Sequence, residues 1–258
     1  MRVSVCLAAY NGSRFITPQI ASILAQLGRD DELVVVDDAS HDDTCAVVEG
    51  LNDGRIKLYR NPQNLGVNDS FARAMSLASG DIIFLSDQDD IWVEGRAAAM
   101  LAPFGDTKVN VVAANYTLID ANGEPTEGYA ATDLRAEDDV RRIGNVARIF
   151  RGNMNYYGCA MALRADFRRM ILPYPPGLEC HDIWIGLIAN LQGSIRHLAQ
   201  STLLHRVHGQ NASIIKRNMR DKLMARVYLL IQLASALCRL ASRPGSVESS
   251  RSGTAAGQ

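Results

Sequence analysis

The sequence lacks the glycine-rich phosphate loops of the common nucleotide-binding folds. Neither GxGxxG nor GxxxxGK[ST] occurs in its 258 residues. A classical dinucleotide-binding fold and a P-loop are therefore disfavoured, because both use glycines where the backbone closes around phosphate. The GxSxG motif is also missing, which argues against a hydrolase with its serine nucleophile on a strand–helix turn.

Cysteine is scarce and scattered, and no charge of one sign dominates. No two of the five cysteines form a CxxC pair, so we expect neither a disulfide framework nor a zinc site, and a reducing cytoplasm fits this usage best. The 27 Lys and Arg residues against 28 Asp and Glu leave a formal net charge of -1. That balance provides no overall field for gathering nucleic acid, and we predict no nucleic-acid partner.

Long hydrophobic runs are also missing. The apolar run at residues 1–9 is too short for a signal peptide and is not followed by a small-residue cleavage site. Residues 227–238 contain no charged side chain, but a membrane-spanning helix needs roughly 20 apolar residues. We therefore expect no spanning segment.

The first half of the chain alternates short apolar runs with helical periodicity. This pattern predicts an α/β fold, in which helices cover both faces of an open, mostly parallel sheet. Expected strands are 3–8, 33–36, 56–59 and 82–85, followed less regularly by strands at 110–115, 158–163 and 202–207 and helices at 182–191 and 216–240. Residues 120–150 are polar and acidic, and we expect a mobile excursion near the site.

The predicted domain organisation has three parts. Residues 1–215 form one catalytic domain, and 216–241 form a C-terminal amphipathic helix. Residues 242–258 are rich in Ser, Gly and Thr and are expected to form a disordered tail.

Polar triplets follow three of the predicted strands. Tyr10-Asn11-Gly12 ends the first strand, Asp37-Asp38-Ala39 the second, and Asp87-Gln88-Asp89 the strand at 82–85. Ligands of such sheets bind outside the carboxyl ends of the strands, so we expect the triplets to converge on one crevice.

The segment Asp87-Gln88-Asp89-Asp90 places three carboxylates directly after a hydrophobic strand. Neighbouring like charges repel unless a cation or strong donors offset them. Oxygen ligands of this kind suit Mg²⁺ or Mn²⁺, which bind through one or two carboxylates together with substrate phosphates. The alternative is an acidic turn that caps the next helix.

Three further features each allow a functional and a purely structural interpretation. Asp38 can accept hydrogen bonds from a base or ribose hydroxyl, or it can belong to a turn and N-cap pair. Asp182 opens an apolar helix, either as a general base or as its N-cap. The stretch His205-Arg206-Val207-His208 offers a guanidinium and imidazoles for a diphosphate or a metal, or the histidines are structural.

Several segments, taken in the order in which they occur along the chain, resemble the inverting family 2 glycosyltransferases of the GT-A fold. The resemblance runs from residue 3 to about residue 213, through VSVCLAAYNG, ELVVVDDASHDDT, NLGVNDSFARAMSLASGDIIFLSDQDDIW, NMNYYGCAMAL, HDIWIGLIA and HRVHGQNAS. It implies transfer of a sugar from a nucleotide-sugar donor to a hydroxyl of a glycan or lipid-linked acceptor, with a divalent cation, Mn²⁺ or Mg²⁺, as cofactor.

The resemblance also implies roles for individual residues. Asp182 matches the general base, and Asp89 matches the direct metal ligand of the DxD pair that begins at Asp87. His208 matches a histidine that reaches the metal or diphosphate, and Arg206 assists the leaving group. The donor-contacting residues implied are Ala9, Tyr10 and Asn11 in the loop beside the base, Asp38 at the base or ribose, and Asp87 with Gln88.

Two departures from the family pattern narrow the expected activity. His181-Asp182 stands where the family usually has an acidic pair, and the QxxRW signature of processive synthases is missing. A non-processive transferase follows. The variants DQDDIW, HDIW and RVHGQN look most like bacterial rhamnosyltransferases of O-antigen and cell-wall polysaccharide synthesis, which implies dTDP-L-rhamnose as donor, with a UDP-hexose as the alternative.

Two rival functions and one open question of location remain. A nucleotidyltransferase also combines an open sheet with acidic metal ligands, and an inactive glycan-binding scaffold could keep the same fold. The helix at 216–241 joins basic residues to an apolar face, so it either lies on the inner face of the cytoplasmic membrane or packs on the core. The expected location is cytoplasmic in both cases.

Overall fold

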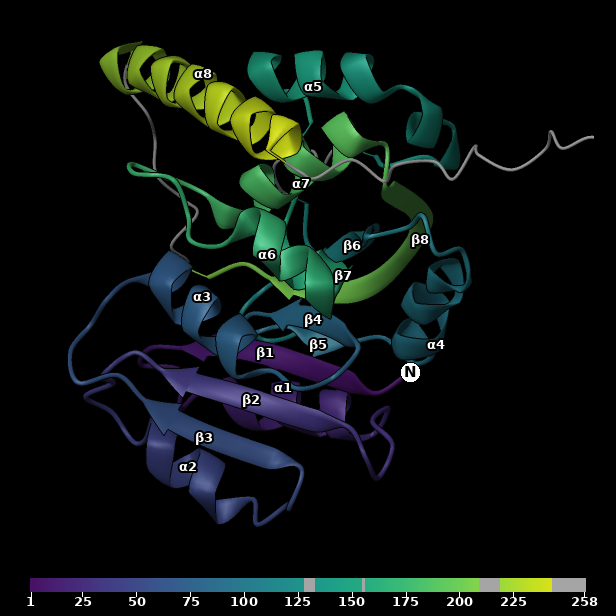
Figure 1. Cartoon of the computed structure of the whole chain (residues 1–258). Helices are drawn as coiled ribbons and strands as arrows, with labels where there is room; N and C mark the ends of the chain where they lie inside the picture. The colour runs from purple at the N-terminus through teal and green to yellow at the C-terminus, as the bar shows by residue number, and fades with distance from the viewer. Residues whose placement is uncertain (128–132, 155, 209–218, 243–258) are drawn as a thin grey trace, which may run out of the picture.

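The computed structural model describes residues 1–127, 133–154, 156–208 and 219–242, which form one layered α/β body (Figure 1). Its single eight-stranded sheet has the order β3-β2-β1-β4-β7-β6-β8-β5. The strands are β1 (Val3–Ala9), β2 (Glu32–Asp37), β3 (Ile56–Arg60), β4 (Ile82–Ser86), β5 (Ile91–Trp92), β6 (Val111–Ile119), β7 (Met161–Arg164) and β8 (Ile195–Arg206).

Strands β3, β2, β1 and β4 pair in parallel, as the alternation of strand and helix patterns predicts. Strand β7 joins β4 in antiparallel orientation, β8 pairs in parallel with β6, and β5 pairs antiparallel with β8. The sheet is therefore mixed, with its parallel half at the N-terminal end of the chain. The predicted α/β class is confirmed.

Helices cover both faces of the sheet. The helices are α1 (Ile16–Leu24), α2 (Thr44–Gly50), α3 (Val67–Leu77), α4 (Arg96–Leu101), α5 (Arg142–Arg151), α6 (Arg168–Ile171), α7 (His181–Gln192) and α8 (Met219–Ala241), with short 3-10 turns at η1 (Ala102–Gly105), η2 (Ala136–Val140), η3 (Gly158–Ala160) and η4 (Ala165–Phe167). Alternate residues of β1 enter opposite cores: Cys6 packs with α3 and α7, whereas Val5 and Leu7 pack with α1.

Two expected elements differ from the structure. The strand expected at 202–207 is only the end of β8, which starts at Ile195, because Arg196, Gln200 and Ser201 interrupt its apolar pattern. The excursion expected at 120–150 contains η2 and α5. Polar contacts bind this segment to the body, and they are not visible in a pattern of hydrophobic residues.

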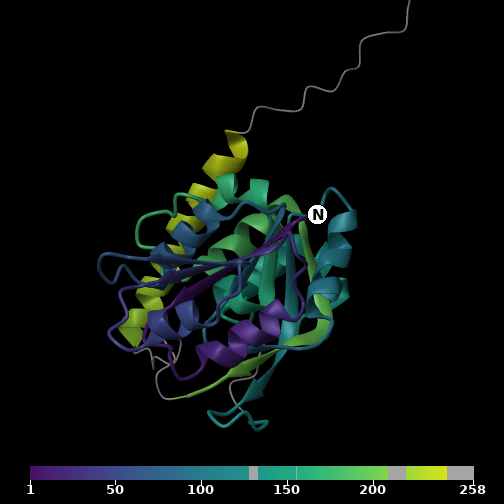
Figure 2. The ribbon, with the colours of Figure 1, turned by 90° about the horizontal axis from the view of Figure 1, so that it is seen from below.

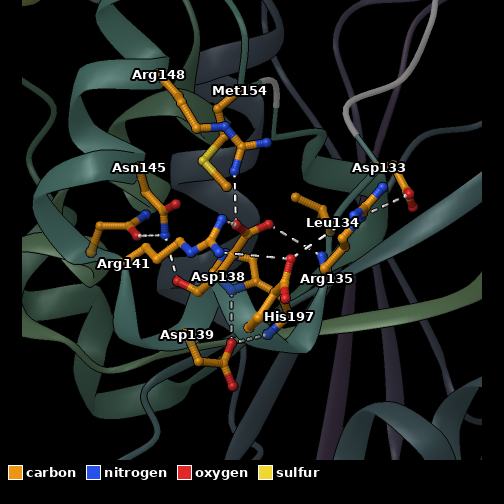
Figure 3. Close-up of polar contacts among 12 residues, drawn as sticks. Asp133, Leu134, Arg135, Asp138, Asp139, Arg141, Asn145, Arg148, Met154 and His197 are labelled. Atoms are coloured by element: carbon orange, nitrogen blue, oxygen red, sulfur yellow. Dashed lines mark hydrogen bonds and ion pairs between the residues drawn. The ribbon is translucent and has the colours of Figure 1, made fainter.

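A buried polar network anchors η2 and α5 (Figure 3). The Asp138 carboxylate lies 2.9 Å from the Arg148 guanidinium, and the Asn145 side chain donates to the Asp138 carbonyl at 2.8 Å. Asp139 bonds both the backbone N–H and the Nδ1 atom of His197 in β8 at 2.8 Å. The segment before α7 is thereby attached to the sheet by charge-assisted hydrogen bonds.

Helix α8 packs on α7 and is longer than the uncharged run in the sequence. Over Met224–Ala241 it is long and apolar enough, by length and composition alone, to cross a membrane, and 17% of that window is buried. The uncharged stretch is thus part of a longer helix, and the expectation that it does not span a bilayer stays a prediction. Residues 209–218 and 243–258, including the predicted tail, lie outside the described residues.

Candidate active site

The three polar triplets lie at the carboxyl ends of β2, β1 and β4, which are neighbours in the sheet. The backbone N–H of Tyr10 donates to Oε1 of Gln88 at 2.8 Å, and Nε2 of Gln88 donates back to the Tyr10 carbonyl at 3.0 Å. The Asp38 N–H donates to the Ala9 carbonyl at 2.7 Å. The structure thus brings the three strand ends together.

The loop after β1 is held tightly. Asn11 adopts the left-handed region with φ 50°, and its Oδ1 accepts a hydrogen bond from the His41 N–H at 2.8 Å. At Gly12 an added Cβ would lie 2.1 Å from Oε1 of Gln88, so a side chain there would displace the Gln88 amide. The Tyr10 side chain is exposed, and its ring meets that of His41 edge-on at 6.5 Å.

Asp38 is buried and is engaged by its own chain. Its Oδ1 accepts hydrogen bonds from Nδ2 of Asn61 at 2.6 Å and from the Leu65 N–H at 2.9 Å, and its Oδ2 accepts from the Gly66 N–H at 2.8 Å. A carboxylate has about four acceptor positions, so these bonds leave little capacity for a base or ribose. Asp38 clearly organises the 61–66 loop, and its direct contact with a donor stays a prediction.

The carboxylates after β4 are crowded into a partly dehydrated site. Burial, with the charges of Asp90 and Asp89, raises the pKa of Asp87 to about 8. Burial and Asp90 also raise the pKa of Asp89, against the opposing effect of His208. Such shifts mark a place where negative charge is unfavourable until a positive partner arrives.

The end of β8 returns to this acidic segment. Nε2 of His208 lies 2.8 Å from Oδ2 of Asp89. The Arg206 guanidinium donates to the Asp89 carbonyl at 2.8 Å and lies 5.0 Å from the ring centre of Phe15, which also stacks on His208 at 4.9 Å. The structure therefore places the predicted residues Asp89, Arg206 and His208 together. The sequence pattern did not single out Phe15.

Asp90 links the acidic segment after β4 to the end of β8. Its Oδ1 accepts hydrogen bonds from Nδ1 of His205 at 2.9 Å and from the Arg206 N–H at 3.0 Å. Burial would lower the pKa of His205, but the hydrogen bond and charge of Asp90, with the charges of Asp87 and Asp89, raise it to about 9. A charged His205 therefore faces a carboxylate inside the protein.

Two groups of side chains have the composition of a metal site. Asp90, Cys159 and His205 offer ligand atoms within 4.8 Å of one another. In this group Nδ1 of His205 is bonded to Asp90, so an ion bound there would have to replace that contact. The predicted set of Asp87, Asp89 and His208 offers carboxylate oxygens and an imidazole, and Asp89 and His208 lie 2.8 Å apart. Among the described residues, however, the Asp90 group is the one whose three ligand atoms lie within 4.8 Å of one another.

Asp182 lies in the first turn of α7. The N-cap residue of α7 is Cys180, so the interpretation of Asp182 as an N-cap was wrong. Its Oδ1 accepts the Ile183 N–H at 2.7 Å, and burial raises its pKa to about 6 despite backbone hydrogen bonds from Ile183 and Gly158. The negative charge of Asp182 also raises the pKa of Asp87, so the two carboxylates interact.

His181, in the position where the resembled family has an acid, is buried against Phe71. Its Nδ1 lies 3.0 Å from Oδ1 of Asn68, and burial lowers its pKa to about 4. The neutral ring fills the core under the first turn of α7 and leaves Asp182 as the ionisable group there.

The α/β fold and the acidic strand ends agree with the comparison with known families. The family model for glycosyl transferase family 2 matches residues 4–170, and the chain belongs to this family. It is therefore a transferase enzyme, as predicted. The nucleotidyltransferase alternative is set aside by the same finding.

Similar proteins include an uncharacterized glycosyltransferase of Nostoc sp., 25% identical over 220 residues that cover 82% of this chain and 66% of that protein. The UDP-Glc:alpha-D-GlcNAc-diphosphoundecaprenol beta-1,3-glucosyltransferase WfgD of Escherichia coli is 32% identical over 120 residues, which cover 46% of this chain and 47% of WfgD. The matched part thus spans less than two thirds of either relative.

Among solved structures, residues 1–349 of S. aureus TarS in complex with UDP-GlcNAc superpose with a TM-score of 0.68 at 19% sequence identity. The match covers 94% of this chain and 73% of the TarS chain. At this identity the likeness establishes the fold, and it agrees with the GT-A fold implied by the sequence motifs.

Proposed function

We propose that this chain is an inverting, non-processive glycosyltransferase that moves a sugar from a nucleotide sugar to a hydroxyl of a glycan or lipid-linked acceptor. The observation that carries the proposal is the meeting of three elements at one end of the sheet: the Gln88-fastened loop after β1, the acidic segment after β4, and Asp182 on α7. A donor bound at the loop after β1 and the acidic segment would lie beside Asp182.

Asp182 is the proposed general base. A pKa of about 6 leaves it largely ionised at neutral pH yet basic enough to take a proton. As the acceptor oxygen attacks the anomeric carbon and transfers its proton to Asp182, the bond from that carbon to the diphosphate oxygen breaks. The nucleoside diphosphate leaves from the opposite face, so a single displacement inverts the anomeric centre.

The donor contacts follow from the same geometry. We assign the nucleoside to the loop of Ala9, Tyr10 and Asn11 and to Asp38, whose backbone N–H donates to the Ala9 carbonyl. Gln88 holds the loop in place through the Tyr10 backbone. The buried Arg206 lies beside Asp89 and provides positive charge near the diphosphate.

Asp87, Asp89 and His208 are the side chains that would hold a divalent cation. Mg²⁺ or Mn²⁺ in that position supplies positive charge for the developing diphosphate. The raised pKa values of Asp87 and Asp89 support this assignment, because ionising both without a cation is costly.

The donor sugar and acceptor rest on resemblance. The motifs DQDDIW, HDIW and RVHGQN favour dTDP-L-rhamnose. The name of WfgD specifies UDP-Glc and a diphosphoundecaprenol-linked acceptor, which favours the UDP-hexose alternative and a lipid-linked acceptor. An acceptor of that kind supports action at the cytoplasmic face of the membrane, in surface polysaccharide synthesis such as that of O-antigen.

The test is release of free nucleoside diphosphate from a panel of nucleotide sugars that includes dTDP-L-rhamnose and UDP-glucose. Each donor is incubated with Mn²⁺, Mg²⁺ or a chelator. The proteins compared are wild type, Asp89→Ala and a matched control, Asp69→Ala, at an exposed position of α3. We expect metal-dependent release from one donor, with a loss of at least about a hundredfold in Asp89→Ala and none in Asp69→Ala.

Release unaffected by Asp89→Ala would overturn the assignment of the acidic segment. Neither binding nor turnover of any donor by the wild type would favour the inactive glycan-binding scaffold.

A further inference from the structure

Helix α8 presents an apolar face to solvent. Met224, Val227, Leu230, Ile231 and Leu237 are 42%, 42%, 58%, 48% and 50% exposed. At about 100° per residue these five positions fall within an arc of about 140°, so they lie along one side of the helix. A surface helix of a globular domain usually turns a polar face outward. An exposed apolar stripe of this kind marks an interaction surface.

The opposite side of α8 is fixed to the catalytic body. Ala225, Gln232 and Ala236 are buried. The Arg239 guanidinium donates to the carbonyls of Met170 at 2.9 Å and Pro173 at 2.5 Å. A helix held in this way cannot be surrounded by lipid, so its exposed face can only lie against a surface.

The charge of this region specifies the surface. Residues 216–243 contain seven Lys and Arg and a single acidic residue, whereas the whole chain has a net charge of -1. Arg226 is exposed between Met224 and Val227. Of these cations, Arg226 is the one that the described part of α8 places beside the apolar stripe, since Arg239 lies on the buried side of the helix. An apolar stripe in a segment of net positive charge complements a surface that is apolar within and anionic at its edge, which describes a bilayer with acidic headgroups.

Helix α5 adds to the same side of the molecule. It lies next to α8 in both views, and both helices pack on α7 (Figures 1 and 2). Val140, at the end of η2, and Ile143, in the first turn of α5, are 83% and 85% exposed. Arg142 and Arg151 are also exposed, so α5 repeats the combination of apolar and basic side chains.

We propose that the outward face of α8, with the end of α5 near it, docks on the surface of an anionic bilayer. The helix lies in the headgroup region, parallel to the membrane, with Leu230 and Ile231 at the centre of the inserted stripe. Long apolar side chains enter the acyl boundary, and the exposed Arg226 contacts lipid phosphates.

Docking on this face would affect the loop that leads to Asp182, because α8 contacts that loop. The Tyr228 ring lies against Gly177, in the loop that leads to Asp182. Arg239 binds Pro173 at the start of the same loop and covers Trp184, two residues after Asp182, at 5.1 Å. If the proposed function is correct, the membrane-bound helix therefore presents the base to a lipid-linked acceptor.

The experiment is flotation of the full chain with vesicles of phosphatidylcholine alone and of phosphatidylcholine mixed with phosphatidylglycerol. The test variant is Leu230→Glu/Ile231→Glu, and the matched control is Ser76→Glu on the exposed side of α3. We expect wild type and control to float only with anionic vesicles and to be released by high salt. The double variant should lose at least about tenfold in vesicle partition.

Circular dichroism establishes that each variant is folded, and donor hydrolysis in solution should be unchanged in all of them. Equal vesicle partition by wild type and the double variant, or binding that resists high salt and alkaline extraction, would overturn the proposal. So would a wild-type dimer that the double variant abolishes, because the face would then bind a second copy. Loss of donor hydrolysis in every protein would refute the proposed function and leave the vesicle result valid.

Discussion

His205 and Asp90, 115 residues apart in the chain, share a buried hydrogen bond of 2.9 Å between Nδ1 and Oδ1. The same Asp90 oxygen accepts the backbone N–H of Arg206. The end of β8 is thereby fastened to the loop after β4. This contact explains how His208, two residues beyond Arg206, reaches Asp89.

Asp90→Ala should therefore damage both stability and activity. It leaves the buried, charged His205 without its carboxylate, and breaking such a pair costs about 3–5 kcal/mol. Asp90→Asn keeps an acceptor oxygen for the Arg206 N–H, so it should unfold at a higher temperature than Asp90→Ala. Donor hydrolysis and thermal unfolding together check this, and wild-type behaviour of Asp90→Ala would contradict the positioning role.

Transfer to the acceptor should fall as the pH drops below about 6, because protonated Asp182 cannot accept a proton. Asp182→Asn should lower kcat by about 10²–10⁴ and remove this acidic limb. The exposed Asp69→Asn is the matched control and should keep the limb. A profile of kcat against pH measures both, and an unchanged limb in Asp182→Asn would exclude this carboxylate as the base.

Asp182 also affects stability in a direction that can be tested. Its folded pKa is raised above the unfolded value near 4, so its contribution to stability is fully present below that value and is lost as the pH rises through about 6. Asp182→Asn should therefore raise the unfolding temperature relative to wild type above pH 6 more than at pH 4. A smaller gain at high pH than at low pH would contradict the burial of this carboxylate.

Gly12→Ala should weaken donor binding. The new Cβ would lie 2.1 Å from Oε1 of Gln88 and force away the amide that holds both backbone groups of Tyr10. The substitution should break two hydrogen bonds of about 1 kcal/mol each. The KM for the donor should therefore rise roughly tenfold or more, while kcat changes less. Gly54→Ala, where nothing lies within 4 Å, is the control. Equal KM values in the two variants would show that the Gln88 contact is dispensable.

The network under α5 should contribute stability from outside the proposed active site. Asp138→Ala removes the partner of Arg148 and should cost about 2–3 kcal/mol, or about 4–12 °C in unfolding temperature. Asp166→Ala removes a comparable ion pair with Arg169 that is exposed, at 3.7 Å, and should change little. Calorimetry of the two variants distinguishes the buried from the exposed pair.

The N-terminal half of the fold could be predicted because its strands are continuous apolar runs, and runs such as residues 33–36 fit only a strand buried on both faces. The polar residues at their ends then predict where the site lies. Strand β8 was seen only in part, since its edge carries Arg196 and Ser201 among apolar residues. Its pairing with β6 depends on a partner about 80 residues earlier.

The sequence by itself determined the family, the α/β class and the identity of the acidic segment, because local patterns and motif order carry that information. Only the tertiary structure decided that Asp90 pairs with His205, that Asp182 follows the cap of α7, and that one side of α8 faces outward. Each of these depends on which groups burial removes from water. Burial is a property of contacts between distant segments, and these contacts set both the pKa values and the exposed surface.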